Sequence, residues 1–301
     1  MAEQLTIHAK GKLLITGEYF VLDGAKALAI PSKFGQSFEF SPTKAPTIVW
    51  NGYDYRNHCW LQETIALPLP EEALSVDSPR GRLLQVLRSV QSLNSTIFES
   101  GWQVTSRLEF PNNWGLGSSS TMIYAMAQWA NVDPYELLQG TFGGSGYDIA
   151  CAGANGPLLY TVERRGQLTT WTPKFSNQLY FVHLNQKQNS REGIRHYRKA
   201  DFDKELVISE LDALTNEIVD CLDLTTFEGL VTRHEALVGG VLGLPLVRER
   251  LFTDYWGAVK SLGAWGGDFV LVTSHRSNAE TVEYFKKKGF ATILKWQEMV
   301  D

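Results

Sequence analysis

The most informative segment of the chain reads Pro111-Asn112-Asn113-Trp114-Gly115-Leu116-Gly117-Ser118-Ser119-Ser120-Thr121. The proline and the two glycines favour a tight turn, and the hydroxyl side chains lead into the helix-forming residues 122–127. A glycine loop that ends where a helix begins presents backbone N–H groups and the positive end of the helix dipole, which together bind phosphate. The segment therefore predicts a nucleotide phosphate site, with the hydroxyls as further donors and one of them as a magnesium ligand.

Two better-known phosphate motifs do not match this segment. A Walker A loop needs Lys-Ser or Lys-Thr after its second glycine, and the dinucleotide-binding fingerprint needs a third glycine. A plain turn with a serine N-cap is the alternative interpretation, and the loop by itself does not separate it from a phosphate site.

The composition restricts the classes of protein to which the chain can belong. Its 301 residues allow one large or two ordinary domains, and a net charge of −5 argues against nucleic acid as a partner. Three distant cysteines (Cys59, Cys151 and Cys221) indicate a reducing compartment without a disulfide framework, and the six histidines show no metal-ligand spacing. Because we find neither a signal pattern nor an apolar run of about 20 residues, we expect a cytoplasmic protein without a membrane partner.

Hydrophobic periodicity and turn residues predict a mixture of strands and helices without regular alternation. This pattern favours an α+β fold over a doubly wound sheet. Strands are expected at 5–8, 19–22, 27–30, 37–40, 102–110, 158–162, 179–184, 269–273 and 291–296. Helices are expected at 82–93, from Asp133 onward, and at 190–200, 205–222, 226–240, 246–261 and 278–288. The change from strand-rich to helix-rich sequence suggests two domains, residues 1–170 and 171–301.

Glycines also accompany chemically useful side chains in three other segments. Lys12 and Glu18 flank the apolar residues 13–15. Asp148 follows the sequence Gly143-Gly144-Ser145-Gly146-Tyr147. A third segment, Gly263-Ala264-Trp265-Gly266-Gly267-Asp268, precedes an expected C-terminal strand. Each segment is weakly informative alone, whereas their order and spacing together are specific.

That order resembles the motifs of the GHMP kinases, the family of galactokinase, homoserine kinase, mevalonate kinase and phosphomevalonate kinase. The three motifs are similar to residues 11–31, 111–119 and 263–268, so the resemblance spans nearly the whole chain. Gly-Tyr-Asp-Ile-Ala at residues 146–150 resembles the signature of a subgroup named for it. The resemblance implies a domain like ribosomal protein S5 domain 2, followed by a ferredoxin-like domain.

The resemblance also implies ATP and Mg²⁺ as cofactors and assigns roles to individual residues. Asp148 matches the catalytic aspartate, and Lys12 matches a lysine that neutralises the growing charge. Ser119 is the expected magnesium ligand. Glu136 lies where some members have a second magnesium ligand, but with Asp133 it also fits a capping box, so both interpretations stay open. The positions assigned to the nucleotide are Pro111, Gly115, Leu116, Gly117, Ser118, Ser119 and Ser120.

The acceptor is expected to be a small molecule, with mevalonate or phosphomevalonate as the leading class and a sugar or amino-acid alcohol as the alternative. The resemblance assigns it Glu18, Tyr19, Gly146, Ser190, Gly266 and Gly267. Lys187 and Arg191 either bind an anionic acceptor or begin a solvated helix. Trp265 replaces the glycine usual in the family, and its indole is expected to narrow the acceptor pocket. A non-catalytic binding or sensor protein on the same scaffold is the rival function. The sequence leaves a homodimer open.

Overall fold

The computed structural model describes residues 3–71, 75, 77–187 and 190–300. Two compact units make up the chain. The first consists of Met1–Gly11, Phe34–Asn112 and Leu116–Gly153, and the second of Lys12–Lys33, Asn113–Gly115 and Ala154–Asp301. The strands β1 (Leu5–Leu14) and β2 (Ala27–Thr43) each contribute residues to both units. The division into two domains, residues 1–170 and 171–301, stays a prediction.

The first unit contains a sheet with the strand order β4-β3-β5-β2, with β1 also paired to β2. Its further strands are β3 (Thr47–Tyr53), β4 (Cys59–Ala66) and β5 (Gly101–Leu108). β5 is parallel to β3 and antiparallel to β2. Side chains of β3 and β5 alternate between buried and more exposed positions, as expected for a sheet with one covered face.

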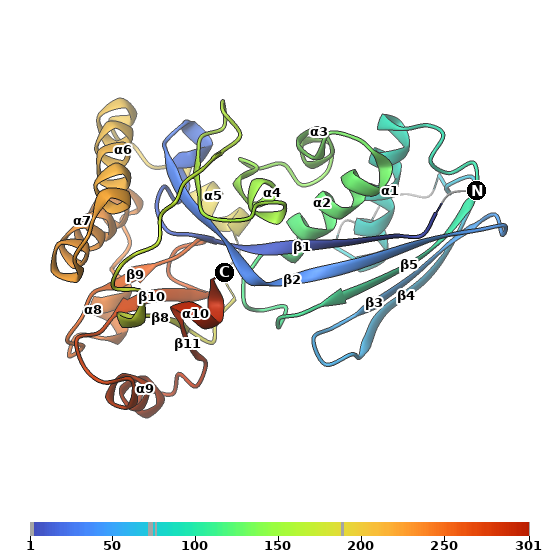
Figure 1. The fold of residues 1–301 in the computed structure, drawn as a ribbon. Helices are drawn as coiled ribbons and strands as arrows, with labels where there is room; N and C mark the ends of the chain where they lie inside the picture. The colour runs from blue at the N-terminus through green and yellow to red at the C-terminus, as the bar shows by residue number, and fades with distance from the viewer. Residues whose placement is uncertain (1–2, 72–74, 76, 188–189, 301) are drawn as a thin grey trace. The chain divides into compact units, whose positions relative to one another are not determined.

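In the described part of this unit, the helices are α1 (Pro79–Leu93), α2 (Ser118–Ala130), α3 (Pro134–Gln139) and α4 (Tyr147–Ala152). α1 and α2 lie along one face of the sheet (Figure 1). The core between them is rich in aromatic rings, and Phe40 stacks on Trp129 with ring centroids 4.9 Å apart. The predicted helix at 82–93 is confirmed, and it begins earlier, at Pro79, because Ser78 caps it.

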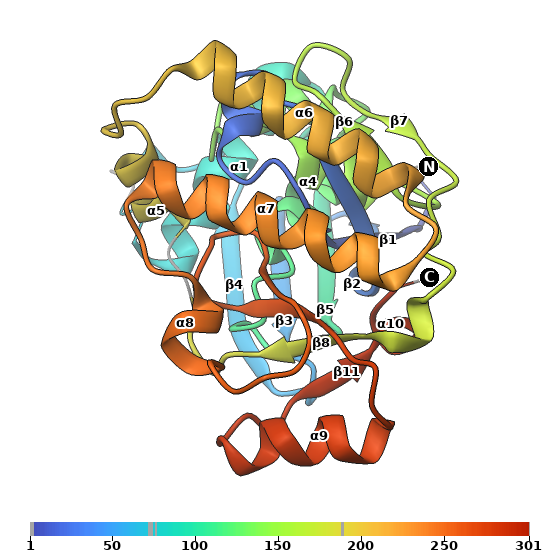
Figure 2. The same ribbon diagram turned by 90° about the vertical axis from the view of Figure 1, so that its left-hand side faces the viewer.

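The second unit contains an antiparallel sheet with the order β11-β8-β10-β9. Its strands are β8 (Leu179–His183), β9 (Val259–Ser261), β10 (Phe269–Thr273) and β11 (Ile293–Lys295). Its helices are α5 (Ser190–Tyr197), α6 (Lys204–Asp220), α7 (Leu224–Leu242), α8 (Val247–Leu251), α9 (Asn278–Lys287) and α10 (Trp296–Met299). α6 and α7 lie side by side (Figure 2). The short strand β6 (Leu158–Tyr160) pairs with Ala27–Ala29 of β2, and β7 (Gln167–Leu168) pairs with β6.

Two predicted elements are wrong. Residues 19–22 form no strand, because left-handed backbone at Gly17, Tyr19 and Gly24 turns the chain through a short 3-10 helix, Phe20–Asp23. The predicted helix at 246–261 ends at Leu251, and the chain continues into β9. There Gly257 lies so close to the backbone of Thr273 that the segment packs along β10. Among the described residues, no helix has the length and apolar character needed to cross a membrane.

Candidate active site

The glycine loop leads directly into α2, as the sequence predicts. Gly117 is the N-cap residue and has left-handed backbone (φ 92°), so its lack of a side chain suits this position. In the first turn of α2, Ser118 is half-buried and Ser119 is exposed, whereas Ser120 is buried. α2 is 13 residues long and brings its N-terminal N–H groups and dipole to the same place. The first turn of α2 can therefore bind an anion.

The other residues assigned to the nucleotide have structural contacts of their own. The buried Ser120 hydroxyl donates a hydrogen bond of 2.8 Å to the carbonyl of Gly117 and so closes the loop onto the helix. Leu116 is buried, whereas Pro111 is half-buried. Ser118 and Ser119 are thus the side chains of this segment that are best placed for a phosphate group.

Asp148 lies on α4, which packs against α2 within the first unit. Gly146 is the buried N-cap residue of α4 and has a φ of 84°. Asp148 follows in the first turn, half-buried, and its Oδ1 lies 3.0 Å from the backbone nitrogen of Ile149. Beyond α4, Gly153 approaches the ring of Tyr124 so closely that a larger residue would overlap it. This close packing fixes the helix of Asp148 against the helix that follows the glycine loop.

Glu136 is exposed in the first turn of α3. The predicted N-cap is confirmed, because Oδ1 of Asp133 accepts hydrogen bonds from the N–H groups of Tyr135 (2.7 Å) and Glu136 (3.3 Å). A role of Glu136 as a magnesium ligand stays a prediction. Among the residues that the structure describes, no three His, Cys, Asp or Glu side chains form a group suited to a metal ion.

Lys12 contacts the first glycine of the loop within the second unit. Its Nζ donates a hydrogen bond of 2.7 Å to the carbonyl of Gly115, and Gly263 also lies close to this ammonium. Gly115 has a φ of 66°, and a Cβ at this position would overlap the carboxylate of Asp268. Sequence reasoning gave Asp268 no role, because its position against Gly115 depends on a contact between segments more than 150 residues apart. At Gly115 the loop is thus bonded to Lys12 and approached closely by the carboxylate of Asp268.

We expect Gly115→Ala to destabilise the protein more than Gly24→Ala does. Both glycines have left-handed backbone, where a non-glycine residue costs about 1–2 kcal/mol. Only Gly115 adds a steric overlap, since no atom lies within 4 Å of a Cβ built at Gly24. Urea unfolding of the two variants measures the difference. Adding Asp268→Ala to Gly115→Ala should recover part of the loss, and equal losses for the two single variants would contradict the overlap.

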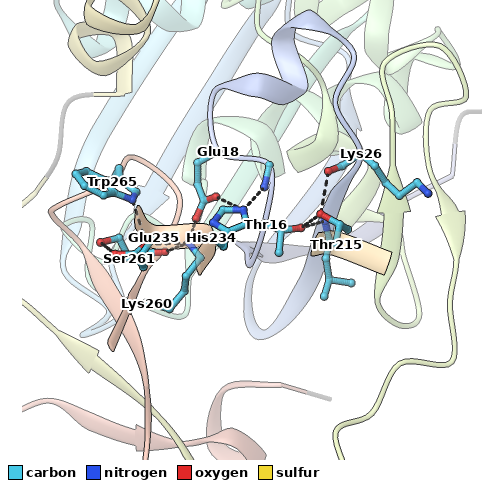
Figure 3. Close-up of polar contacts among 11 residues, drawn as sticks. Thr16, Glu18, Lys26, Thr215, His234, Glu235, Lys260, Ser261 and Trp265 are labelled. Carbon is cyan, nitrogen blue, oxygen red and sulfur yellow. Dashed lines mark hydrogen bonds and ion pairs between the residues drawn. The ribbon is translucent and has the colours of Figure 1, made fainter. Parts of the chain in front are cut away.

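Glu18 belongs to a buried cluster of ionisable side chains (Figure 3). Glu18, His234, Glu235 and Lys260 are all at most 2 % exposed. Nζ of Lys260 donates a hydrogen bond to Oε1 of Glu18 and lies 3.2 Å from Oε1 of Glu235. His234 Nε2 lies 3.5 Å from Oε2 of Glu18 and accepts a hydrogen bond from the Gly17 N–H. The carboxylate of Glu18, which the resemblance assigns to the acceptor, is engaged inside the protein.

Burial perturbs the protonation of this cluster. It raises the pKa of Glu18 from 4.5 to about 7, although Lys260 opposes part of the shift. Burial also lowers the pKa of His234 well below its ordinary value, and the charge of Lys260 acts in the same direction. Burial disfavours the charged form of Lys260, but the carboxylates of Glu18 and Glu235 outweigh this effect and raise its pKa. At neutral pH Lys260 is therefore protonated and His234 is neutral, while the carboxyl group of Glu18 titrates with a pKa of about 7.

We expect Glu18→Gln to remove a pH-dependent loss of stability. Because the folded protein holds the Glu18 proton more tightly than the unfolded chain, this stabilisation is complete below pH 4.5 and disappears as the pH rises to about 7. The shift corresponds to about 3 kcal/mol in the free energy of unfolding. His234 contributes a slope of opposite sign below pH 6.5, which both proteins share.

Urea unfolding between pH 4.5 and 8 measures this difference. The stability of the wild type should fall relative to that of Glu18→Gln as the pH rises. A constant difference across this range would show that Glu18 keeps an ordinary pKa in the folded protein.

The remaining predicted acceptor residues lie in the second unit or on α4. Tyr19 is buried, has a φ of 61° and stacks on Tyr197 with ring centroids 5.9 Å apart. Gly266 is half-buried and its carbonyl accepts a hydrogen bond of 3.3 Å from Arg250, whereas Gly267 is buried. Ser190 begins α5, but its side chain and that of Arg191 lie outside the described residues. An acceptor role for these residues stays a prediction.

Comparisons with known proteins place these elements in a known fold. No family model and no curated protein sequence matches the chain. Among solved structures, mevalonate kinase of Methanococcus jannaschii superposes with a TM-score of 0.74 at 17 % identity, covering 97 % of this chain and 98 % of that one. The chain has the fold of the GHMP kinases.

Two further solved structures superpose on the chain over nearly its whole length. Phosphomevalonate kinase of Streptococcus pneumoniae, in complex with phosphomevalonate and AMPPNP, superposes with a TM-score of 0.72 at 15 % identity over 97 % of this chain and 99 % of that one. Galactokinase of Lactococcus lactis, complexed with galactose, superposes with a TM-score of 0.67 at 12 % identity over 95 % and 88 %. The predicted two-domain α+β GHMP kinase fold is confirmed, whereas membership of the subgroup named for residues 146–150 stays a prediction.

Proposed function

We propose that the chain is an ATP-dependent kinase that transfers the γ-phosphoryl group of ATP to a small-molecule hydroxyl or phosphate. The observation that carries this proposal is the glycine loop, which ends at the N-terminus of α2 with Ser118 and Ser119 accessible. The full-length likeness to mevalonate kinase and phosphomevalonate kinase supports the same reaction and makes mevalonate or phosphomevalonate the leading acceptor. The fold alone would not identify the reaction.

The residues of the chain would share the work of phosphoryl transfer. The N–H groups and hydroxyls at the start of α2 would bind the β- and γ-phosphates, and the exposed Ser119 would offer an oxygen ligand to Mg²⁺. Bound Mg²⁺ neutralises charge on the transferring phosphoryl group. Asp148 accepts the proton of the acceptor hydroxyl or orients its oxygen. Lys12 stabilises negative charge at the loop while its hydrogen bond holds Gly115 in place.

A panel of acceptors tests this proposal. The protein is incubated with Mg·ATP and separately with mevalonate, phosphomevalonate, galactose and homoserine, and ADP release is measured. We expect release with mevalonate or phosphomevalonate above the level without acceptor. Gly117→Val should suppress it, because a β-branched side chain at this left-handed N-cap obstructs the phosphate site. If none of the acceptors raises ADP release above the background, although calorimetry shows that the protein binds Mg·ATP, the result would favour the non-catalytic sensor.

A further inference from the structure

The buried cluster connects two segments that are far apart in the sequence. Glu18 belongs to the segment 17–19, which follows β1. Lys260 lies on β9, directly before the glycine-rich turn at 263–267. α7 supplies His234 and Glu235 between them (Figure 3). Both segments contain residues that the resemblance assigns to the acceptor.

The segment 17–19 has a backbone conformation that needs support. Tyr19 has a left-handed φ of 61°, which is unfavourable for an aromatic residue and persists only where neighbouring contacts hold it. On one side, the adjacent Glu18 is bound by Lys260 inside the protein. On the other side, the ring of Tyr19 packs on Tyr197 and against Gly193 of α5. Lys260 is thus one of the anchors of this strained segment.

The glycine-rich turn is anchored to the same cluster. The indole N–H of Trp265 donates a hydrogen bond of 3.1 Å to Oε1 of Glu235, the same oxygen that lies 3.2 Å from Lys260. Ser261 Oγ donates to the other oxygen, Oε2, at 3.0 Å. Trp265 is 2 % exposed and belongs to the apolar cluster that contains Tyr19, so its indole lies in the protein core. The indole that replaces the usual glycine therefore fastens the turn to α7.

We propose that Lys260 is a positioning residue for acceptor binding: its ammonium lies between Glu18 and Glu235 and fixes both segment 17–19 and the turn at 263–267. The acceptor role of these segments rests on the proposed kinase function. The anchoring itself rests on contacts within the second unit. A buried lysine that served stability alone would affect the whole unit equally, whereas a positioning lysine acts first on the segments that it holds.

Hydrogen exchange followed by mass spectrometry separates these roles without any acceptor. In Lys260→Met, exchange of peptides covering 17–24 and 262–267 should increase by about tenfold or more, because the strained segment and the turn open more easily once their common anchor is removed. The comparison is made at short labelling times, when local opening dominates exchange and the global unfolding that Lys260→Met also favours has not yet contributed; at these times, peptides covering α6 and β8 should change much less. The matched control is Lys33→Met, which removes an exposed lysine. A uniform increase over the second unit, or none, would overturn the proposal.

Two additions keep the test decisive. If Lys260→Met does not fold, Glu235→Gln keeps the Lys260–Glu18 bond and should loosen the 262–267 peptide but not 17–24. With an acceptor that the wild type phosphorylates, the KM for the acceptor should rise in the folded variants while the KM for ATP stays unchanged. Altered exchange without any phosphorylated acceptor would contradict the kinase function and leave the anchoring intact. If the protein is an active kinase but the variants change neither the exchange nor the KM for the acceptor, the anchoring is contradicted and the kinase function is not.

Discussion

Asp148→Asn is expected to lower the rate of phosphoryl transfer by about 10²–10⁴-fold, the usual cost of losing a general base. The amide keeps the size of the side chain but cannot accept the proton of the acceptor hydroxyl. Asp148 is not the N-cap of α4, because Gly146 occupies that position. The melting temperature of the variant should therefore stay close to that of the wild type, and its affinity for Mg·ATP should be preserved.

The matched control for this substitution is Asp133→Asn. Asp133 is the N-cap residue of α3, where asparagine caps as well as aspartate, so activity and stability should both be retained. An Asp148→Asn protein that is fully active and stable would remove the general base from the mechanism. A variant that loses activity only because it unfolds would instead assign Asp148 a structural role.

Lys260→Met is expected to lower the free energy of unfolding by about 3–5 kcal/mol, because it leaves two buried carboxylates without their cation. Combining it with Glu18→Gln should recover part of this loss, since the double variant no longer buries the charge of Glu18. Urea unfolding of both single variants and the double variant measures the coupling between the two residues. The control Lys33→Met should change stability by no more than about 0.5 kcal/mol. Strictly additive effects of Glu18→Gln and Lys260→Met would contradict their direct pairing.

Local sequence patterns were sufficient to predict the elements whose causes are local. The glycine loop before α2 and the Asp133-Pro134 start of α3 depend on backbone conformation and capping within a few residues, and both are confirmed. The α+β class follows from the periodicity of the strands and helices. Candidate roles for Asp148 and Lys12 came from the resemblance, because neither residue stands out by composition.

Local sequence patterns could not predict the buried cluster around Glu18. Lys260 occupies a short strand and Glu235 a helix, and only tertiary packing brings them to Glu18. A lone lysine is usually exposed, and the sequence around Lys260 does not predict that its ammonium is buried. The wrong strand at 19–22 has a similar cause, since the apolar run is buried through a 3-10 turn whose left-handed residues the alternation pattern does not reveal.

The most direct test of the kinase function is to follow the γ-phosphoryl group itself. The wild type and Asp148→Asn are incubated with Mg²⁺, mevalonate or phosphomevalonate, and ATP carrying ¹⁸O in its γ-phosphoryl group, and the products are identified by mass spectrometry. We predict that the wild type gives ADP and an acceptor that carries the labelled phosphoryl group, and that Asp148→Asn gives very little of either. ATP hydrolysis to labelled inorganic phosphate with every acceptor in the panel, or an unchanged yield from Asp148→Asn, would contradict the proposed reaction.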